Sequence, residues 1–224
     1  MNFLSHYYFE RFASESEQVL GGLLPDLLRN VDKDYSFQLK KLEHKLDFHP
    51  KGTAITEGWR RHMEVDKLFH GSDFFYTHTH HLRKHIESVV EDLPVRASFL
   101  AHIALELLLD HLLIADHIVN VTRLYEHLAA VDRPVVGLYL KELGEVDVDR
   151  FFVFYDGFLT SKYIYDYADI ANIPHALYNI CKRVWDFQPQ QKHVDELSVR
   201  LKEYQIRYLE NYREIYTFIQ DKIE

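Results

Sequence analysis

The chain has few of the residues that make covalent cross-links, turns and flexible segments. Its 224 residues include a single cysteine, Cys181, which excludes an internal disulfide framework. Eight glycines and six prolines provide few turn signals, and alternation of apolar and polar residues over the length of a strand is rare. The sequence therefore predicts an all-α fold, a single-domain helical bundle over residues 1–224.

Long hydrophobic runs are also missing. The most apolar stretch, residues 103–114, is interrupted by acidic side chains and is shorter than the roughly 20 residues that cross a bilayer. The opening M-N-F-L-S-H lacks the basic region, apolar core and cleavage site of a signal peptide. We therefore expect a soluble, cytoplasmic protein that does not bind a membrane.

Positive charge is in deficit, because 26 Lys and Arg residues stand against 35 Asp and Glu residues, a formal net charge of -9. A general nucleic-acid-binding surface needs a basic footprint, so we expect no nucleic-acid partner. The sequence does not indicate an oligomeric state.

Several catalytic motifs are absent as well. The sequence contains no G-x-x-x-x-G-K-[ST], G-x-G-x-x-G, G-x-S-x-G or C-x-x-C. These absences exclude the usual nucleotide-binding loops, the serine-hydrolase elbow and thiol redox motifs. Any chemistry has to come from residues that are scattered along the chain.

Apolar spacing and capping residues predict helices along most of the chain. Pro25, after the glycine pair Gly21 and Gly22, predicts a bend or break at Asp26. The clearest helix is a long C-terminal amphipathic one from Lys192, where apolar residues recur every three or four positions. The other expected helical segments are 14–30, 36–48, 56–70 with Thr56 as N-cap, 73–91, 94–130 with a break near Asn120, 134–143 and 147–159.

One apolar segment, A-L-E-L-L-L-D-H-L-L at 104–113, carries ionisable residues. Glu106 and Asp110 are one helical turn apart with His102 a turn before them, and His111 lies about 100° around the helix from Asp110. Burial of an unpaired carboxylate costs several kcal/mol. The pattern therefore predicts a partner, which is a cation, a hydrogen-bond network or a metal ion.

Two other sites contain histidine in a suggestive place. His62 and Asp66 are four residues apart on an expected helix, so they point the same way and can hold one cation or each other. By spacing alone, this pair is equally compatible with a surface hydrogen bond, and His6 with a histidine of the core. In the run T-H-T-H-H at 77–81, the side chains fan around a helix or lie in a loop, which does not favour a metal site.

Four motifs in order resemble those of the acyl carrier protein phosphodiesterase family. They are M-N-F-L-S-H at 1–6, G-G-L-L-P-D-L-L-R at 21–29, H-M-E-V-D at 62–66 and E-L-L-L-D-H-L-L at 106–113. The segment K-Y-I-Y-D-Y-A-D-I-A-N-I-P-H-A-L-Y-N-I-C-K-R-V at 162–184 is similar to a later helical part of that family, so the resemblance spans nearly the whole chain.

The resemblance implies an all-helical fold related to the HD-type metal phosphohydrolases. It also implies hydrolysis of the phosphodiester that joins 4'-phosphopantetheine to a serine of holo-acyl carrier protein. The expected cofactor is a divalent cation, Mn²⁺ first, with Mg²⁺, Fe²⁺ and Zn²⁺ as alternatives. A metal ion would also account for acids in an apolar bundle, because its charge offsets their desolvation.

The site residues follow from the matching positions. The resemblance implies that the metal ligands are Asp26, His62, Asp66 and Asp110, and that the catalytic residues are His6, Glu106 and His111. We expect the four ligands to converge in one pocket. For docking of the acidic carrier protein, the basic residues beside the His62 motif are the candidates, namely Arg60, Arg61 and Lys67.

Three positions depart from the family pattern. Met63 stands where an arginine is usual, His70 where another acid is usual, and Glu106 where an aspartate is usual. These departures leave two alternatives open. One is an HD-like phosphohydrolase for a small or nucleotide-like phosphoester, and the other is a catalytically inactive helical binding protein.

Overall fold

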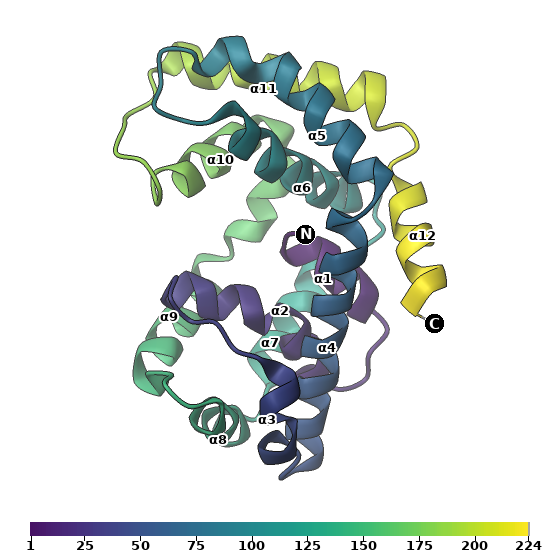
Figure 1. Cartoon of the computed structure of the whole chain (residues 1–224), viewed down its shortest axis with the longest axis vertical. Coiled ribbons are helices and arrows are strands. Elements are labelled where there is room, and N and C mark those ends of the chain that lie inside the picture. The colour runs from purple at the N-terminus through teal and green to yellow at the C-terminus, as the bar shows by residue number, and fades with distance from the viewer. Residues whose placement is uncertain (224) are drawn as a thin grey trace. The chain divides into compact units, whose positions relative to one another are not determined.

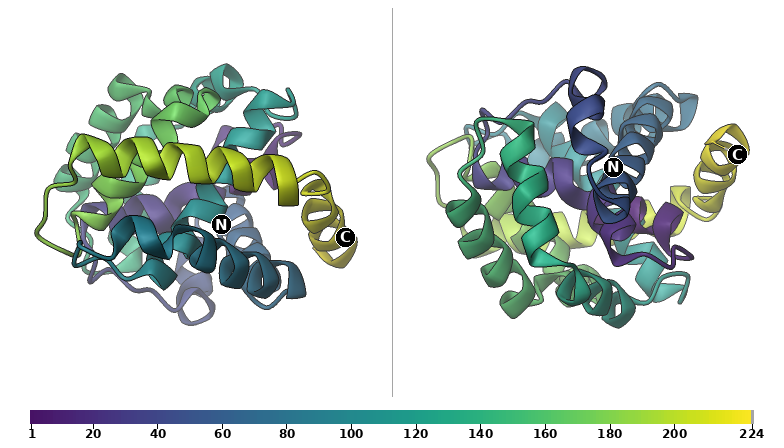
Figure 2. Two further views of the ribbon diagram at one scale, coloured as in Figure 1. Left: turned by 90° about the horizontal axis from the view of Figure 1, so that it is seen from above. Right: turned by 90° about the horizontal axis from the view of Figure 1, so that it is seen from below.

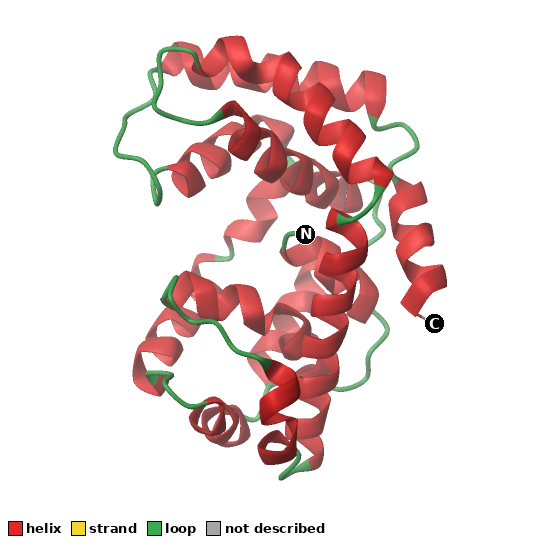
Figure 3. Ribbon diagram, viewed as in Figure 1, coloured by secondary structure: helices red, strands yellow, loops and turns green. Residues whose placement is uncertain are grey.

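The structure, a computed structural model, describes residues 1–223 and all of their side chains except that of Glu43. All regular secondary structure in this part of the chain is helical (Figure 3), which confirms the predicted all-α class. The chain divides into two compact units. The first unit consists of Met1–Asn2, Lys67–Ile118 and Ile164–Glu224, and the second unit consists of Phe3–Asp66 and Val119–Tyr163.

The second unit is organised around α2 (Ser16–Val31). This helix packs against α1 (Phe3–Glu10), α7 (Val121–Ala130) and α9 (Val148–Ser161). The remaining helices of the unit are α3 (Leu39–Leu46), α8 (Arg133–Leu143), which packs on α3, and most of α4 (Pro50–His70) (Figure 1).

The first unit is organised around α6 (Ala97–Ala115). This helix packs against α5 (Asp73–Ile86) and α10 (Ile173–Cys181), and α11 (Gln191–Tyr208) runs beside α5 in Figures 1 and 2. The remaining elements of the unit are α12 (Arg213–Ile223), the short 3-10 helices η1 (Glu87–Val90) and η3 (Ile170–Asn172), and all but the first residue of η2 (Tyr163–Ala168).

The predicted break near Asn120 is confirmed. α6 ends at Ala115, and Asn120 caps the following helix, because its Oδ1 accepts a hydrogen bond from the main-chain N–H of Arg123 at 3.0 Å. The cap satisfies one of the N–H groups that the first turn of a helix leaves unpaired.

Of the two predicted alternatives at Asp26, the helix break is wrong, because α2 continues through Pro25 to Val31, and the bend stays a prediction. A proline inside a helix costs about 3 kcal/mol. Against this, burial of one leucine stabilises a fold by about 1.5–3 kcal/mol. Five leucines of α2 are at most 1% exposed, and their burial outweighs the cost of the proline: Leu20, Leu23, Leu24, Leu27 and Leu28.

The predicted start of α4 at Thr56 is also wrong. The helix begins at Pro50, a position where proline's fixed φ and missing N–H are tolerated. The Thr56 hydroxyl lies inside the helix, donates to the carbonyl of Gly52 at 3.2 Å and lies 3.0 Å from the hydroxyl of Tyr139. Thr56 therefore ties α4 to α8 and caps nothing.

The C-terminal segment is helical as predicted, but it forms two helices, α11 and α12, with a turn at 209–212. Within the turn, Tyr212 is 3% exposed and its hydroxyl donates to Oδ2 of Asp116 at 2.8 Å. The apolar spacing continues across the turn, so the pattern alone does not indicate the break.

α6 is the helix in the described part of the chain that is long and apolar enough to cross a membrane. Its most apolar 18-residue window has a mean hydropathy of 1.6, and the helix is longer than the apolar run of the sequence suggests. However, 67% of that window is buried inside the protein. This burial is typical of the core helix of a soluble protein.

Candidate metal centre

The site in the second unit depends on a close contact between α2 and α4. A Cβ atom at Gly21 would overlap the main-chain carbonyl of Ile55, and one at Gly58 would overlap the carbonyl of Gln18. Only glycine lets two backbones approach this closely. The glycine pair of α2 therefore serves helix packing.

The same contact determines which ring nitrogen of His62 carries a proton in the neutral ring. Its side chain is 3% exposed, and Nδ1 lies 2.9 Å from the carbonyl oxygen of Gly22. Because a carbonyl only accepts, Nδ1 carries the proton and donates it. In the neutral ring, the lone pair is then on Nε2, which lies 3.7 Å from Oδ2 of Asp66. Histidines that bind metals are commonly held in this way.

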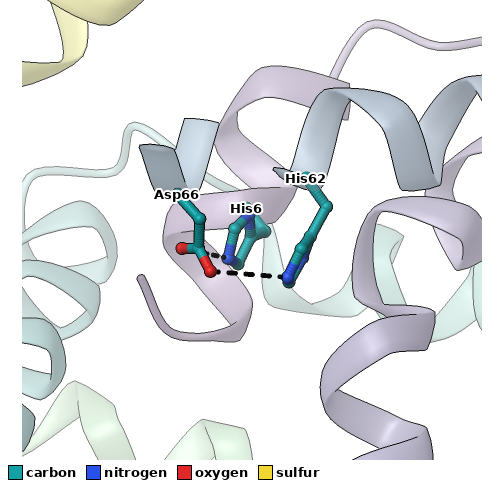
Figure 4. Close-up of side chains that lie close together, drawn as sticks. All are labelled: His6, His62 and Asp66. Atoms are coloured by element: carbon teal, nitrogen blue, oxygen red, sulfur yellow. Dashed lines mark ion pairs between the residues drawn. The ribbon is translucent and has the colours of Figure 1, made fainter. Parts of the chain in front are cut away.

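His6 of α1 joins His62 and Asp66 in a cluster (Figure 4). The His6 and His62 rings stack with centroids 3.7 Å apart and an interplanar angle of 17°. Nε2 of His6 lies 3.3 Å from Oδ1 of Asp66, and the candidate ligand atoms of all three residues are within 4.8 Å of one another. The structure thus places His6, expected as a catalytic residue, beside two expected ligands.

The cluster combines an uncharged imidazole with an ionised carboxylate. Burial and repulsion from His62 lower the pKa of His6 to about 3, against the attraction of Asp66. Burial by itself would raise the pKa of Asp66, but its interactions with His6 and His62 lower that pKa below the usual range. At neutral pH both groups are therefore in the form that binds a metal ion.

The residues present fit a divalent cation. Both ring nitrogens of His6 are buried and lack a hydrogen-bond partner among the described residues, since the contact with Asp66 does not have hydrogen-bond geometry. An unsatisfied buried polar group costs about 1–3 kcal/mol, which a metal bond to Nε2 would relieve. Two imidazoles and one carboxylate suit Mn²⁺, Fe²⁺ or Zn²⁺ better than Mg²⁺, which prefers oxygen ligands.

Asp26 is not among the three residues of this cluster. It lies half-buried on α2, and its main-chain carbonyl accepts a hydrogen bond from Nδ2 of Asn30 at 2.7 Å. Its expected part as a metal ligand stays a prediction.

Glu106 lies in the first unit and has its own histidine partners. Its Oε1 is 3.0 Å from Nε2 of His102 and 3.2 Å from Nε2 of His70. The amino group of Met1 lies 3.3 Å from the same oxygen. Burial would raise the pKa of Glu106, but the Met1 ammonium and the two histidines lower it, so the carboxylate is ionised.

Asp110 and His111 also belong to the first unit. Asp110 is fully buried, and its Oδ2 accepts a hydrogen bond from Nδ2 of Asn2 at 2.9 Å. His111 is buried, and its Nδ1–H donates to the carbonyl of Tyr167 at 2.8 Å. Catalysis by His111 and the convergence of Asp110 with His62 and Asp66 stay predictions.

The three basic residues expected to dock a partner differ in their surroundings. Arg60 and Lys67 are exposed on α4. Arg61 is half-buried, and its Nε lies 3.2 Å from Oε1 of Glu10, a carboxylate that is 2% exposed. Arg61 therefore lies beside a buried acid within the second unit.

The sequence places His102 one helical turn before Glu106, but it does not connect His70 with either residue. The four-residue spacing of His102 and Glu106 was a visible signal for that pair. His70 is 36 residues away from Glu106 in the chain, and no spacing rule connects them. Its place in the group is set by tertiary packing.

Comparison with known proteins finds no match to a protein-family model, to a curated protein or to a solved structure. The resemblance to the acyl carrier protein phosphodiesterases therefore stays a prediction from the motifs quoted above.

Proposed function

We propose that the chain is a metal-dependent phosphodiester hydrolase whose ion is held by His6, His62 and Asp66. The observation that supports this is the convergence of two buried imidazoles on one carboxylate, with both nitrogens of His6 left without a hydrogen-bond partner among the described residues. The motif resemblance supplies the proposed substrate, holo-acyl carrier protein, which would lose 4'-phosphopantetheine to give the apo form. The ion that we expect is Mn²⁺, and the proposed location is the cytoplasm.

The residues of the cluster have separate parts in this proposal. A divalent ion, when bound, supplies a positive charge that polarises a phosphoryl oxygen and lowers the pKa of water. Gly22 orients the His62 ring, and Asp66 provides the anionic ligand. Because the pKa of His6 is about 3, this residue is uncharged at neutral pH, which suits a ligand and not a proton donor to the leaving serine.

The test is incubation of the purified, Mn²⁺-loaded protein with holo-acyl carrier protein, followed by mass spectrometry of the carrier. We expect the apo form to appear with wild type. Asp66→Asn should slow the reaction more than about 100-fold, since a catalytic metal is worth several kcal/mol. The matched control is Glu64→Gln, an exposed acid on the same helix, which should keep the wild-type rate. Intact holo carrier after incubation with wild type would contradict the proposed substrate.

A second candidate is hydrolysis of a small phosphoester by the same cluster. The observation that favours it is the pairing of Arg61 with the buried Glu10, which occupies one of the three basic residues expected to dock an acidic carrier protein. A chain with a net charge of -9 repels such a partner unless a local basic surface offsets the charge.

Charge reversal separates the two substrates. Arg60→Glu combined with Lys67→Glu should lower kcat/KM for holo-acyl carrier protein several-fold. Added salt should slow the wild-type enzyme, because exposed charges at the edge of an interface mainly set the association rate and are screened by salt. Hydrolysis of a small phosphodiester should not change. Lys182→Glu combined with Lys202→Glu, two exposed sites away from α4, controls for the same change of four charge units. Unchanged activity on the carrier protein in both experiments would favour the small substrate.

A further inference from the structure

Three ligating side chains meet within the first unit, around Oε1 of Glu106. Nε2 of His102 lies 3.0 Å and Nε2 of His70 lies 3.2 Å from this oxygen, and the three candidate ligand atoms are within 4.8 Å of one another. We propose that His70, His102 and Glu106 form a second metal site that binds a zinc-like transition-metal dication. This site uses none of the three ligands proposed for the hydrolase, but it includes Glu106, for which the resemblance implies a catalytic part.

The two nitrogen–oxygen distances fit one ion. Two atoms bound to the same tetrahedral zinc at about 2.0–2.2 Å are about 3.3 Å apart. The observed nitrogen–oxygen distances of 3.0 and 3.2 Å are close to this value. An ion therefore needs little movement of either histidine relative to Glu106, and the two histidine nitrogens are within 4.8 Å of each other.

Hydrogen bonding explains the positions of these side chains around Glu106 less well than a bound metal ion does. Three nitrogens crowd a single carboxylate oxygen, because the amino group of Met1 is also 3.3 Å from Oε1 of Glu106. A carboxylate oxygen has two lone pairs, so it does not accept well from three donors. A bound ion would take the histidine lone pairs and the carboxylate charge together, and it would displace the competing ammonium group.

Aromatic packing holds both histidine rings in place. The Phe75 ring meets His70 edge-on at 4.9 Å and 82°, and it meets His102 at 4.9 Å and 80°. Phe69 contacts both His70 and Phe75, with ring centroids 5.1 Å and 5.0 Å away. Aromatic contacts of this kind favour edge-to-face geometry, which leaves the nitrogen edges of both rings facing Glu106.

The site is open on one side. The side chains of His70 and His102 are 33% and 40% exposed, whereas that of Glu106 is 10% exposed. His102 also lines a surface hollow of about 590 Å³, together with Arg96, Phe99 and Trp185. Three protein ligands with an accessible fourth position are the arrangement of catalytic zinc sites, and two histidines with one glutamate are among the known ligand sets. The hollow would admit a small anionic ligand, because Arg96 lies on its wall.

The experiment is a zinc titration of the metal-free full chain by isothermal calorimetry, with the bound metal counted after desalting. His102→Ala should bind one zinc ion fewer than wild type, or bind that ion at least about 10–100-fold more weakly. The test compares the number of zinc ions bound by wild type with the number bound by His102→Ala. Any zinc at the His6 cluster is present in both proteins and does not affect this difference. His6→Leu should remove a different ion and leave the ion at Glu106 in place.

The matched control is His80→Asn, an exposed histidine of the histidine-rich run at 77–81. This variant should bind as many ions as wild type. Equal zinc content in His102→Ala and wild type would overturn the proposal, and an equal loss in His80→Asn would show surface binding only.

A second measurement on wild type does not depend on the folding of a variant. Nitrogen-15 spectra of the imidazole groups should show zinc-induced shifts at Nε2 of both His70 and His102. Unshifted resonances of these two residues at saturating zinc would also overturn the site.

Discussion

The Nδ1–H group of His62 donates to the main-chain carbonyl of Gly22 across 2.9 Å, and this bond joins α4 to α2 at the candidate metal centre. Its length depends on glycines that let the two helices touch, Gly21 and Gly58. The orientation of a ligand ring is thus controlled by residues that have no side chains of their own.

Gly58→Ala tests this control. The added methyl group would overlap the carbonyl of Gln18, push α4 away from α2 and weaken the His62–Gly22 bond. We expect the free energy of unfolding to fall by about 1–3 kcal/mol in urea denaturation. We also expect Mn²⁺ affinity to fall at least about 10-fold, because the ring loses its support.

Gly157→Ala is the matched control for that prediction. Gly157 lies in α9, and no atom outside its local backbone would lie within 4 Å of its new methyl group. Alanine is the better helix former by about 1 kcal/mol, so this variant should gain stability. If Gly58→Ala proved as stable as Gly157→Ala, the close contact would not be essential.

His6→Leu should separate stability from metal binding. The substitution removes two buried ring nitrogens that have no hydrogen-bond partner among the described residues. Leucine fills the position with an apolar side chain of similar size. The metal-free variant should be more stable than wild type by about 1 kcal/mol. Mn²⁺ should raise the Tm of wild type and leave that of the variant unchanged. An equal Mn²⁺-induced rise in both proteins would exclude His6 as a ligand.

Glu10 should make stability depend on pH. Burial, partly offset by Arg61 and Gln18, raises the pKa of Glu10 from 4.5 to about 7. The folded protein therefore keeps this proton to higher pH than the unfolded chain does. The resulting stabilisation is complete below pH 4.5 and is lost as the pH rises through about 7.

Glu10→Gln removes that dependence. Between about pH 4.5 and pH 8, the unfolding free energy of the variant should rise relative to wild type by up to about 3 kcal/mol, at 1.36 kcal/mol per pKa unit. Chemical denaturation at both ends of this range measures the difference. Glu64→Gln, at an exposed position on α4, should show no such trend. A constant difference between Glu10→Gln and wild type across this range would mean that Glu10 does not titrate as described.

The helical class and much of the candidate site could be predicted from local sequence. The scarcity of glycine, proline and strand-like alternation indicated an all-α fold, and the four-residue step from His62 to Asp66 indicated a shared helix face. His6 came only from the motif resemblance, because its stacking on His62 is a contact between two helices that no spacing rule describes.

The incorrect predictions for α2 also come from contacts between residues that local sequence does not show. Pro25 reads as a helix breaker, but tertiary burial of the surrounding leucines keeps α2 continuous. The glycine pair before it contributes only to that local signal, whereas Gly21 allows close packing of α2 on α4. In each case the backbone preference of the residue was identified correctly. Its effect on the helix depends on packing against residues that are distant in the sequence.

The central claim is that His6, His62 and Asp66 together hold one divalent ion. The most direct test is an anomalous difference map at the manganese absorption edge, from crystals grown with MnCl₂. The account predicts a peak at bonding distance, about 2.0–2.6 Å, from Nε2 of His6, Nε2 of His62 and the Asp66 carboxylate. A map without a peak among these three side chains, from crystals in which Mn²⁺ is present, would contradict it.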